Sequence, residues 1–109
     1  MTKYFDKTNY FWYYKGMIKR FESGISAKAI GFEYLSWIKS YALKAHLLGT
    51  VFEKNDGSIK IIAEGEDTDL NELAKKLENS NFLFPMENFY VKWEKPKGDY
   101  KDFSISLQH

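Results

Sequence analysis

Two acidic side chains, Glu33 and Glu53, stand where a pair of carboxylates would suit acid–base chemistry. Glu33 lies at the start of a helical pattern, and Glu53 follows a short apolar run that is typical of a strand. Acid–base work by two carboxylates needs a cleft and a raised pKa for one of them. The sequence shows neither condition, so we interpret both side chains as solvated surface carboxylates.

Three further polar side chains are candidates for binding or catalysis. Lys28 lies in a loop of small residues and offers a point charge for an anion such as phosphate or sulfate, although a solvated loop lysine is the simpler interpretation. Asn55 precedes Asp56-Gly57, so we expect its side chain to bond to nearby backbone in a tight turn. His46 has no ligand or base partner in view, and we interpret it as structural.

Composition excludes several classes of chemistry. The 109 residues include no cysteine, which excludes disulfides, thiolate nucleophiles and cysteine-ligated zinc, and we predict neither a metal nor a cofactor. Sixteen basic against fifteen acidic residues give a formal charge of +1, too little to indicate nucleic acid or an anionic membrane. No apolar run reaches the roughly 18 residues of a membrane helix. The N-terminus lacks a secretory pattern, so we predict a cytoplasmic protein.

The first elements follow from hydrophobic periodicity. Alternation from Ile18 to Ile25 predicts a strand, with Gly24 as a bulge. Apolar residues at helical spacing from Tyr34 to Ala45 predict an amphipathic helix whose core-facing stripe includes Trp37. Two apolar runs, 48–52 and 58–63, flank the Asp-Gly pair and predict a β-hairpin.

The remaining elements complete a recognisable order. A second helix should begin after Gly65, capped by Thr68 or Asp69, and end near residue 79. Alternation predicts a strand around Phe89 to Trp93, with Trp93 in the core, and a short final strand at 103–107. The order β-α-β-β-α-β plus a last strand predicts an α+β ferredoxin-like sandwich, with two helices on one face of an antiparallel sheet.

Two segments resemble the acylphosphatase family. One is LLGTVFEKNDGSIKIIAEGEDTDLNELAKKLEN (47–79), similar to the family's G-W-V-x-N, D-G-S-V and A-E-G before an acidic helix. The other is FYVKWEKPKGDYKDFSI (89–105), similar to its closing strand, E-x-P-x-G turn and final aromatic strand. The resemblance covers roughly residues 18–107. It implies hydrolysis of carboxyl-phosphate anhydrides at a phosphate loop of the form G-x-V-x-G-V-G-F-R, with a catalytic arginine and a water-orienting asparagine.

The family's catalytic pair is missing from this sequence. An ungapped alignment places Leu35 at the arginine position and Glu53 at the asparagine position, while a second register, with two extra residues in the helix, places Glu33 at the arginine position. The only arginine of the chain is Arg20, in the first predicted strand. We therefore expect no catalytic residue. The anion-binding loop candidates are Ala27, Lys28, Ala29, Ile30, Gly31, Phe32, Glu33 and Tyr34.

These substitutions weaken the case for an enzyme. A guanidinium gives phosphoryl oxygens two parallel donors that leucine lacks, and a comparable arginine is worth about 10³ to 10⁵ in rate. The Glu53 carboxylate repels a phosphate by about 1 kcal/mol even across 4 Å of water. Our first hypothesis is a catalytically degenerate acylphosphatase-like domain that serves as a small-anion-binding or protein-interaction module. The alternative is a divergent acylphosphatase that hydrolyses carboxyl-phosphate bonds through the 27–35 loop with Lys28.

A third hypothesis is an RNA-binding sandwich that stacks bases on Tyr90, Phe52 or the aromatic cluster at 10–14. The sequence has no RNP-like run and no element rich in basic charge, so nucleic acid is disfavoured. Residues 1–16 form an aromatic extension ahead of the domain at 17–109. We expect this extension to cover the sheet or an edge strand, or to contact a protein partner or a second copy.

Overall fold

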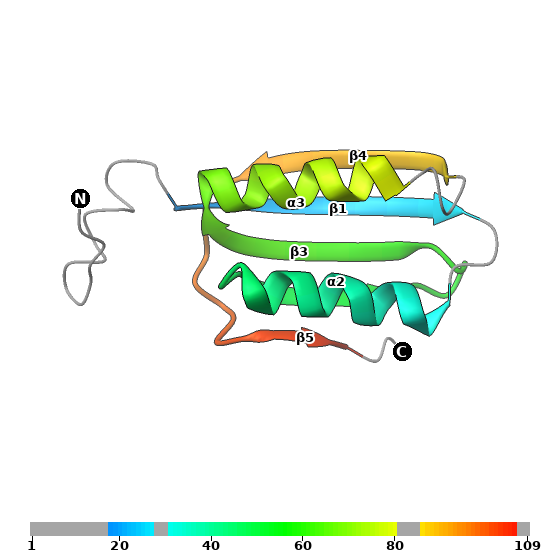
Figure 1. Ribbon diagram of the computed structural model, residues 1–109, viewed down its shortest axis with the longest axis horizontal. Coiled ribbons are helices and arrows are strands. Elements are labelled where there is room, and N and C mark those ends of the chain that lie inside the picture. Colours follow the sequence, from blue (N-terminus) through cyan, green and yellow to red (C-terminus); the bar gives the residue numbers. More distant parts are fainter. Residues whose placement is uncertain (1–17, 28–30, 81–85, 107–109) are drawn as a thin grey trace.

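The computed structural model describes residues 18–27, 31–80 and 86–106 (Figure 1). The aromatic extension, loop residues 28–30 and Leu107 lie outside the described residues. The elements follow the predicted order of an α+β ferredoxin-like fold: β1 (Ile18–Ala27), α2 (Phe32–Lys44), β2 (Leu48–Glu53), β3 (Ile59–Glu66), α3 (Asp67–Asn79), β4 (Met86–Glu94) and β5 (Phe103–Ile105).

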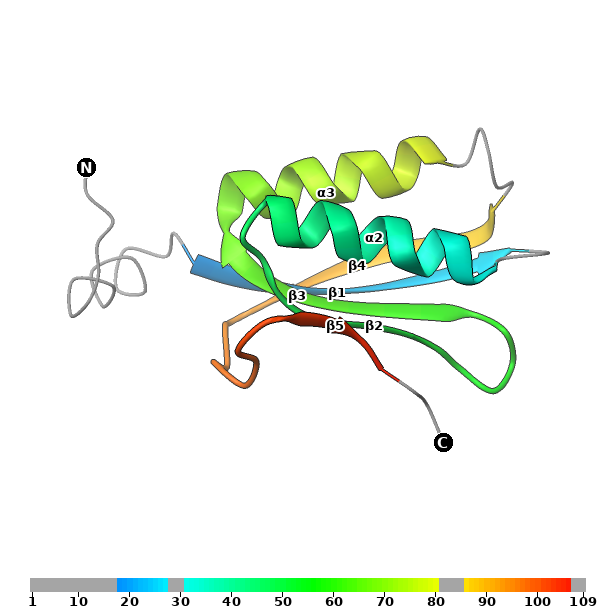
Figure 2. The same cartoon turned by 60° about the horizontal axis from the view of Figure 1, so that its bottom comes forward.

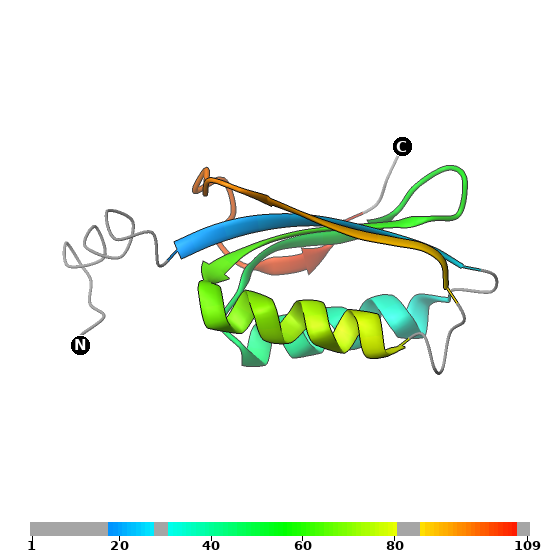
Figure 3. The same ribbon diagram turned by 90° about the horizontal axis from the view of Figure 1, so that it is seen from above.

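The five strands form one sheet in the order β4-β1-β3-β2-β5. The pairs among β4, β1, β3 and β2 are antiparallel as predicted, whereas β5 runs parallel to β2, so the sheet is mixed. Both helices cover the same face of the sheet (Figures 2 and 3). None of the described helices crosses the opposite face, which we call the helix-free face.

The core lies between the sheet and the two helices. Alternate residues of the strands point into it, as Phe21 and Ile25 do from β1. Helix α3 contributes Leu70, Leu73 and Leu77, whose spacing of three and four residues places them on one side of the helix. The other fully enclosed apolar side chains come from β2, β3, β5, α2 and the turn after α2: Val51, Ile59, Ile61, Ala63, Phe103, Ile38, Ala42 and Leu47.

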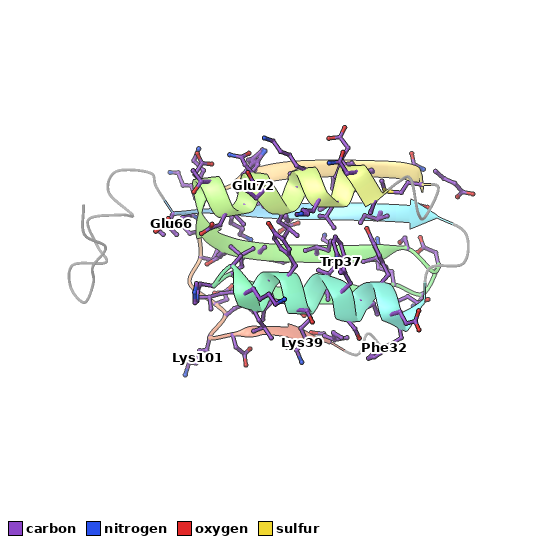
Figure 4. All side chains as sticks on the ribbon, viewed as in Figure 1. Phe32, Trp37, Lys39, Glu66, Glu72 and Lys101 are labelled. Carbon is purple, nitrogen blue, oxygen red and sulfur yellow. The ribbon has the colours of Figure 1, made fainter. Side chains whose placement is uncertain are left out.

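The two tryptophans predicted to lie in the core are both partly exposed. Trp37 is 38% exposed and stacks on Tyr34 at a ring distance of 5.7 Å, on the side of α2 that faces α3 (Figure 4). Trp93 is 42% exposed because β4 is an edge strand, and its ring meets Phe21 edge-on at 5.6 Å. The position on α2 that is buried in place of Trp37 is Leu35.

Two local predictions were also wrong. Gly24 is regularly paired on both sides, and the irregularity in the β1–β4 register lies between Ser26 and Ala27. Helix α3 begins at Asp67 with Glu66 as its N-cap, so Thr68 and Asp69 lie inside the first turn. Strand β3 continues into the helix without a loop, which leaves no room for the later cap. Across residues 18–27, 31–80 and 86–106, no helix has the length and apolarity needed to cross a membrane.

Candidate functional site

The first candidate site lies at the end of the sheet where the C-termini of β1 and β2 lie. Both strands are antiparallel to β3, so they run in the same direction and their C-terminal ends lie at the same end of the sheet. Helix α2 begins at this end, next to the β2–β3 hairpin (Figure 1). The fold therefore brings the end of β1, the start of α2 and Glu53 to one end of the molecule.

The N-terminus of α2 has an open first turn. Gly31 is the N-cap residue and no side chain caps the helix, although the amide of Tyr34 donates to the Gly31 carbonyl over 3.0 Å. Amide groups of a first helical turn and the helix dipole favour an anion. Phe32 is 67% exposed and Glu33 is exposed beside it, so the carboxylate of Glu33 competes with any anion at this end.

The side chains of Leu35, at the family's arginine position, and of the loop candidate Tyr34 both belong to the core. Leu35 is only 6% exposed and packs in the hydrophobic cluster under α2. Tyr34 is 3% exposed, and its hydroxyl shares a 2.8 Å hydrogen bond with Ser80 at the end of α3. Burial raises the pKa of Tyr34, and the bond to Ser80 only partly offsets this. Neither side chain is placed to contact an anion in solvent.

Glu53 and Glu33 are both exposed, as expected for solvated carboxylates. After Glu53 the chain turns through 54–58, where the Gly57 amide donates to the Lys54 carbonyl over 2.9 Å. The side-chain bond that we expected of Asn55 is made by Asp56, whose Oδ1 accepts from the Ser58 amide at 2.9 Å. The turn is an Asx motif, and Asn55 stays exposed.

His46 lies just past the end of α2, and its side chain is exposed. It follows α2 with a φ of 60°, in the left-handed region. Its amide donates to the Leu43 carbonyl over 3.1 Å, and the next amide, of Leu47, donates to the Ala42 carbonyl over 2.9 Å. These two bonds form a Schellman motif, which ends a helix and usually has glycine at this position.

Arg20 is unavailable to a phosphate. It is 4% exposed on the helix-free face. Its Nη1 donates to Glu64 over 3.1 Å and its Nη2 donates to Glu22 over 3.3 Å. Burial alone lowers the pKa of Arg20, but these two hydrogen bonds outweigh that effect and raise it. The guanidinium is committed to carboxylates.

Sequence patterns drew attention to Glu64 as part of the A-E-G run but gave it no role. Its two carboxylate oxygens accept from the Lys97 amide at 2.8 Å and the Gly98 amide at 3.0 Å, in addition to Arg20. The signal that pointed to it was the pairing of A-E-G with the later E-x-P-x-G run, whose turn it binds. Among the described residues, no group of three or more histidine or acidic side chains is arranged to hold a metal.

Comparisons with known proteins decide the family. The Acylphosphatase family profile matches residues 28–105, which is most of the chain. The chain belongs to the acylphosphatase family. It is 32% identical over 78 residues to an acylphosphatase of Paenarthrobacter aurescens, covering 72% of this chain and 81% of that protein. It is 28% identical over 78 residues to one of Caldanaerobacter subterraneus, covering 72% and 84%.

A solved structure of similar shape agrees with this assignment at the level of the fold. The acylphosphatase from Bacillus subtilis superposes with a TM-score of 0.72 at 21% identity, covering 83% of this chain and 99% of that one. The ferredoxin-like fold predicted from the element order is confirmed.

Proposed function

We propose that the protein is a divergent acylphosphatase that hydrolyses carboxyl-phosphate bonds. The proposed site is the β1–α2 loop, at the end of the sheet where β1 and β2 end. The observation that carries this proposal is family membership over residues 28–105, a range that includes the loop, α2 and the end of β2. The missing pair made loss of catalysis our first hypothesis from the sequence. Family membership moves our proposal to the divergent enzyme.

In this proposal, backbone N–H groups hold the phosphoryl oxygens. The donors are the amides of the loop and of the open first turn of α2, aided by Lys28 as a point charge. A water oxygen attacks phosphorus, the bond from phosphorus to the acyl oxygen breaks, and the carboxylate leaves while the proton of the water passes to solvent. Positioning and charge neutralisation supply most of such catalysis, so these donors suffice for turnover.

Turnover should be slow relative to an acylphosphatase with a guanidinium. Lys28 lacks the two parallel donors of arginine, and Glu33 and Glu53 add negative charge at the same end. We expect a rate lower by about 10³ to 10⁵ on this account.

The test is hydrolysis of benzoyl phosphate by the purified protein beside four variants. Lys28→Gln should lower the rate, while Lys101→Gln, at the opposite end of the sheet from Phe32 (Figure 4), should not. Glu33→Arg and Glu33→Arg with Glu53→Asn should raise it, because both sites are exposed and the changes replace negative charge with a donor. Leu35→Arg is a poor test, since it would put a guanidinium into the core.

A module without turnover is the second candidate, favoured by the commitment of Arg20 to Glu64 and Glu22. Absence of turnover in the natural protein, together with phosphate binding that Lys28→Gln weakens, would overturn the enzyme in favour of an anion-binding module. Absence of both turnover and phosphate binding would leave a protein-interaction module as the explanation.

A further inference from the structure

Residues on the helix-free face line up in rows across the strands. One row runs Tyr90, Gly24, Lys60 and Phe52, from β4 through β1 and β3 to β2, because each residue is paired directly with the next. Neighbours along each strand point to the opposite face, where Ile25 lies in the core, so this row faces away from the helices. We call it the Tyr90 row.

The ring of Tyr90 rests on the backbone of Gly24. A Cβ atom at Gly24 would lie 2.3 Å from Cε2 of Tyr90, so only glycine lets the ring lie so close to β1. The Ser23 hydroxyl donates to the Tyr90 carbonyl over 2.8 Å and ties the two strands together at this point. Tyr90 is nevertheless 51% exposed. The row thus presents an aromatic ring that is supported from below and open to solvent.

A hollow of about 160 Å³ opens beside this ring. Tyr90 and Gly24 line it together with Asn88, Lys54, Lys60 and Asp56. Sites for drug-sized ligands occupy about 300 to 1,000 Å³, whereas this hollow holds about five water volumes. It suits a single ring.

Charge at the hollow favours an anion. Lys60 already pairs with Glu22, Nζ to Oε1 over 3.2 Å. Asp56 accepts hydrogen bonds from the amide and hydroxyl of Ser58, at 2.9 and 2.6 Å. Lys54 forms no ion pair within the described part of the chain, and it lines both this hollow and an adjoining one that extends to Phe52. The cation of the hollow without a close ion-pair partner is therefore Lys54, although, after the hydrogen bonds from Ser58, its charge also helps to lower the pKa of Asp56 in the same hollow.

We propose that this hollow is a binding site for a small planar anion, an aromatic ring that carries one carboxylate or similar group. The ring stacks on the open face of Tyr90, since aromatic pairs favour offset stacking, and the anionic group contacts Lys54. A nucleic acid strand is disfavoured because Glu22 and Glu94 follow on the same face, one and two rows further along β1 and β4. The site is independent of phosphate hydrolysis.

The experiment is an NMR titration of the full chain with benzoate, and with cyclohexanecarboxylate as a probe of equal charge that lacks a flat ring. We expect benzoate to shift the amide signals of Gly24, Lys54 and Asn88, and cyclohexanecarboxylate to bind several-fold more weakly. Tyr90→Leu should weaken benzoate binding about tenfold, the lower part of the range seen when stacking aromatics are removed. Tyr90→Phe should keep it, which separates loss of the ring from loss of fold.

Two lysine variants complete the test. Lys54→Gln should weaken benzoate binding about two- to fivefold, as expected for one exposed charge contact. Lys92→Gln is the matched control, because Lys92 is exposed on the same face, pairs with Glu94 at 3.5 Å and does not line the hollow. Equal binding of both carboxylates, shifts confined to residues 31–35, or loss of binding in Lys92→Gln but not in Lys54→Gln would each overturn the proposal.

Discussion

The carboxylate of Glu64 on β3 faces the guanidinium of Arg20 on β1, Oε2 to Nη1 over 3.1 Å, and the two residues are paired directly in the sheet register. The same carboxylate accepts the Lys97 and Gly98 amides. Those amides belong to the connection that leaves the edge strand β4 and crosses to β5 at the other edge. One buried ion pair therefore anchors the crossing connection to the middle of the sheet.

Removal of Arg20 should be strongly destabilising. Arg20→Met leaves the buried carboxylate of Glu64 without its cation and Glu22 with Lys60 as its remaining partner, and loss of one partner of a buried pair costs about 3 to 5 kcal/mol. The control is Lys19→Met, because Lys19 meets Asp67 at 3.8 Å and both side chains are 44% exposed. That change should cost less than about 1 kcal/mol. Urea unfolding measures the stability of both variants. Equal losses of stability would contradict a structural role for the buried ion pair of Arg20 and Glu64.

Gly49 should not tolerate a side chain. Its φ is 146°, and a Cβ atom there would lie 1.9 Å from the carbonyl oxygen of Ile62 on the neighbouring strand. The β2–β3 pair would have to separate, so we expect Gly49→Ala to cost about 3 kcal/mol or more. Gly31→Ala meets no atom within 4 Å and should cost less than about 1 kcal/mol. Thermal unfolding gives the melting temperatures of both variants. Similar values would contradict a clash between a Cβ atom at position 49 and the Ile62 carbonyl.

An arginine at Leu35 and one at Glu33 should have very different effects on stability. Leu35→Arg places a charge among buried apolar side chains, and an unpaired buried charge costs several kcal/mol. Glu33→Arg changes an exposed side chain, so its free energy of unfolding should stay within about 1 kcal/mol of the natural value. We expect a small loss, because a cation at the start of α2 is unfavourable to the helix dipole. Guanidinium-induced unfolding gives both values. A stable Leu35→Arg protein would show that the position can open to solvent.

The fold was predictable from the sequence because local signals agreed with each other. Alternation along β1, the Asp-Gly turn and the stripe of α3 each set an element, and their order allowed one architecture. Periodicity assigns faces less well where two sides of a helix are both apolar. On α2 it put Trp37 inwards and left out Leu35, because a large aromatic side chain also packs against its own helix neighbours.

The candidate site was less predictable. Sequence patterns located the loop segment and the odd residues in it, since their types depart from the family form. They named Tyr90 and Phe52 as candidate stacking residues but gave no sign that Gly24 and Lys60 lie between them, because the four residues come from four separate strands and meet only through the pairing register. The commitment of Arg20 was hidden for the same reason: Glu64 is 44 residues away in the chain.

Replacement of His46 by glycine should stabilise the protein. His46 holds the left-handed conformation of a Schellman motif, which costs a residue with a Cβ atom about 1 kcal/mol or more. His46→Gly removes this cost but adds freedom to the unfolded chain, so we expect a net gain of about 0.5 to 1 kcal/mol, or a few degrees in Tm. His46→Ala keeps the strain and should bring no gain. A Tm for His46→Gly no higher than that for His46→Ala would contradict this account.

Glu22 should make stability depend on pH in the acid range. Burial by itself raises the pKa of Glu22, but the hydrogen bonds and charges of Lys60 and then Arg20 outweigh it, and the pKa lies below its usual value. The unfolded chain therefore takes up the proton first as the pH falls below about 4.3. The contribution of Glu22 is complete above that pH and is lost as the pH falls through the lower pKa of the folded state.

Urea midpoints measured from about pH 7 to about pH 2.5 should fall less steeply for Glu22→Gln than for the natural protein. Within that window the slopes should differ by up to about 1.4 kcal/mol per pH unit, the effect of one proton. Glu78→Gln, which changes an exposed carboxylate on α3, is the matched control and should keep the natural slope. Parallel curves for Glu22→Gln and the natural protein would mean that Lys60 and Arg20 do not hold this carboxylate in solution. Glu64 would then be the main partner of the Arg20 guanidinium.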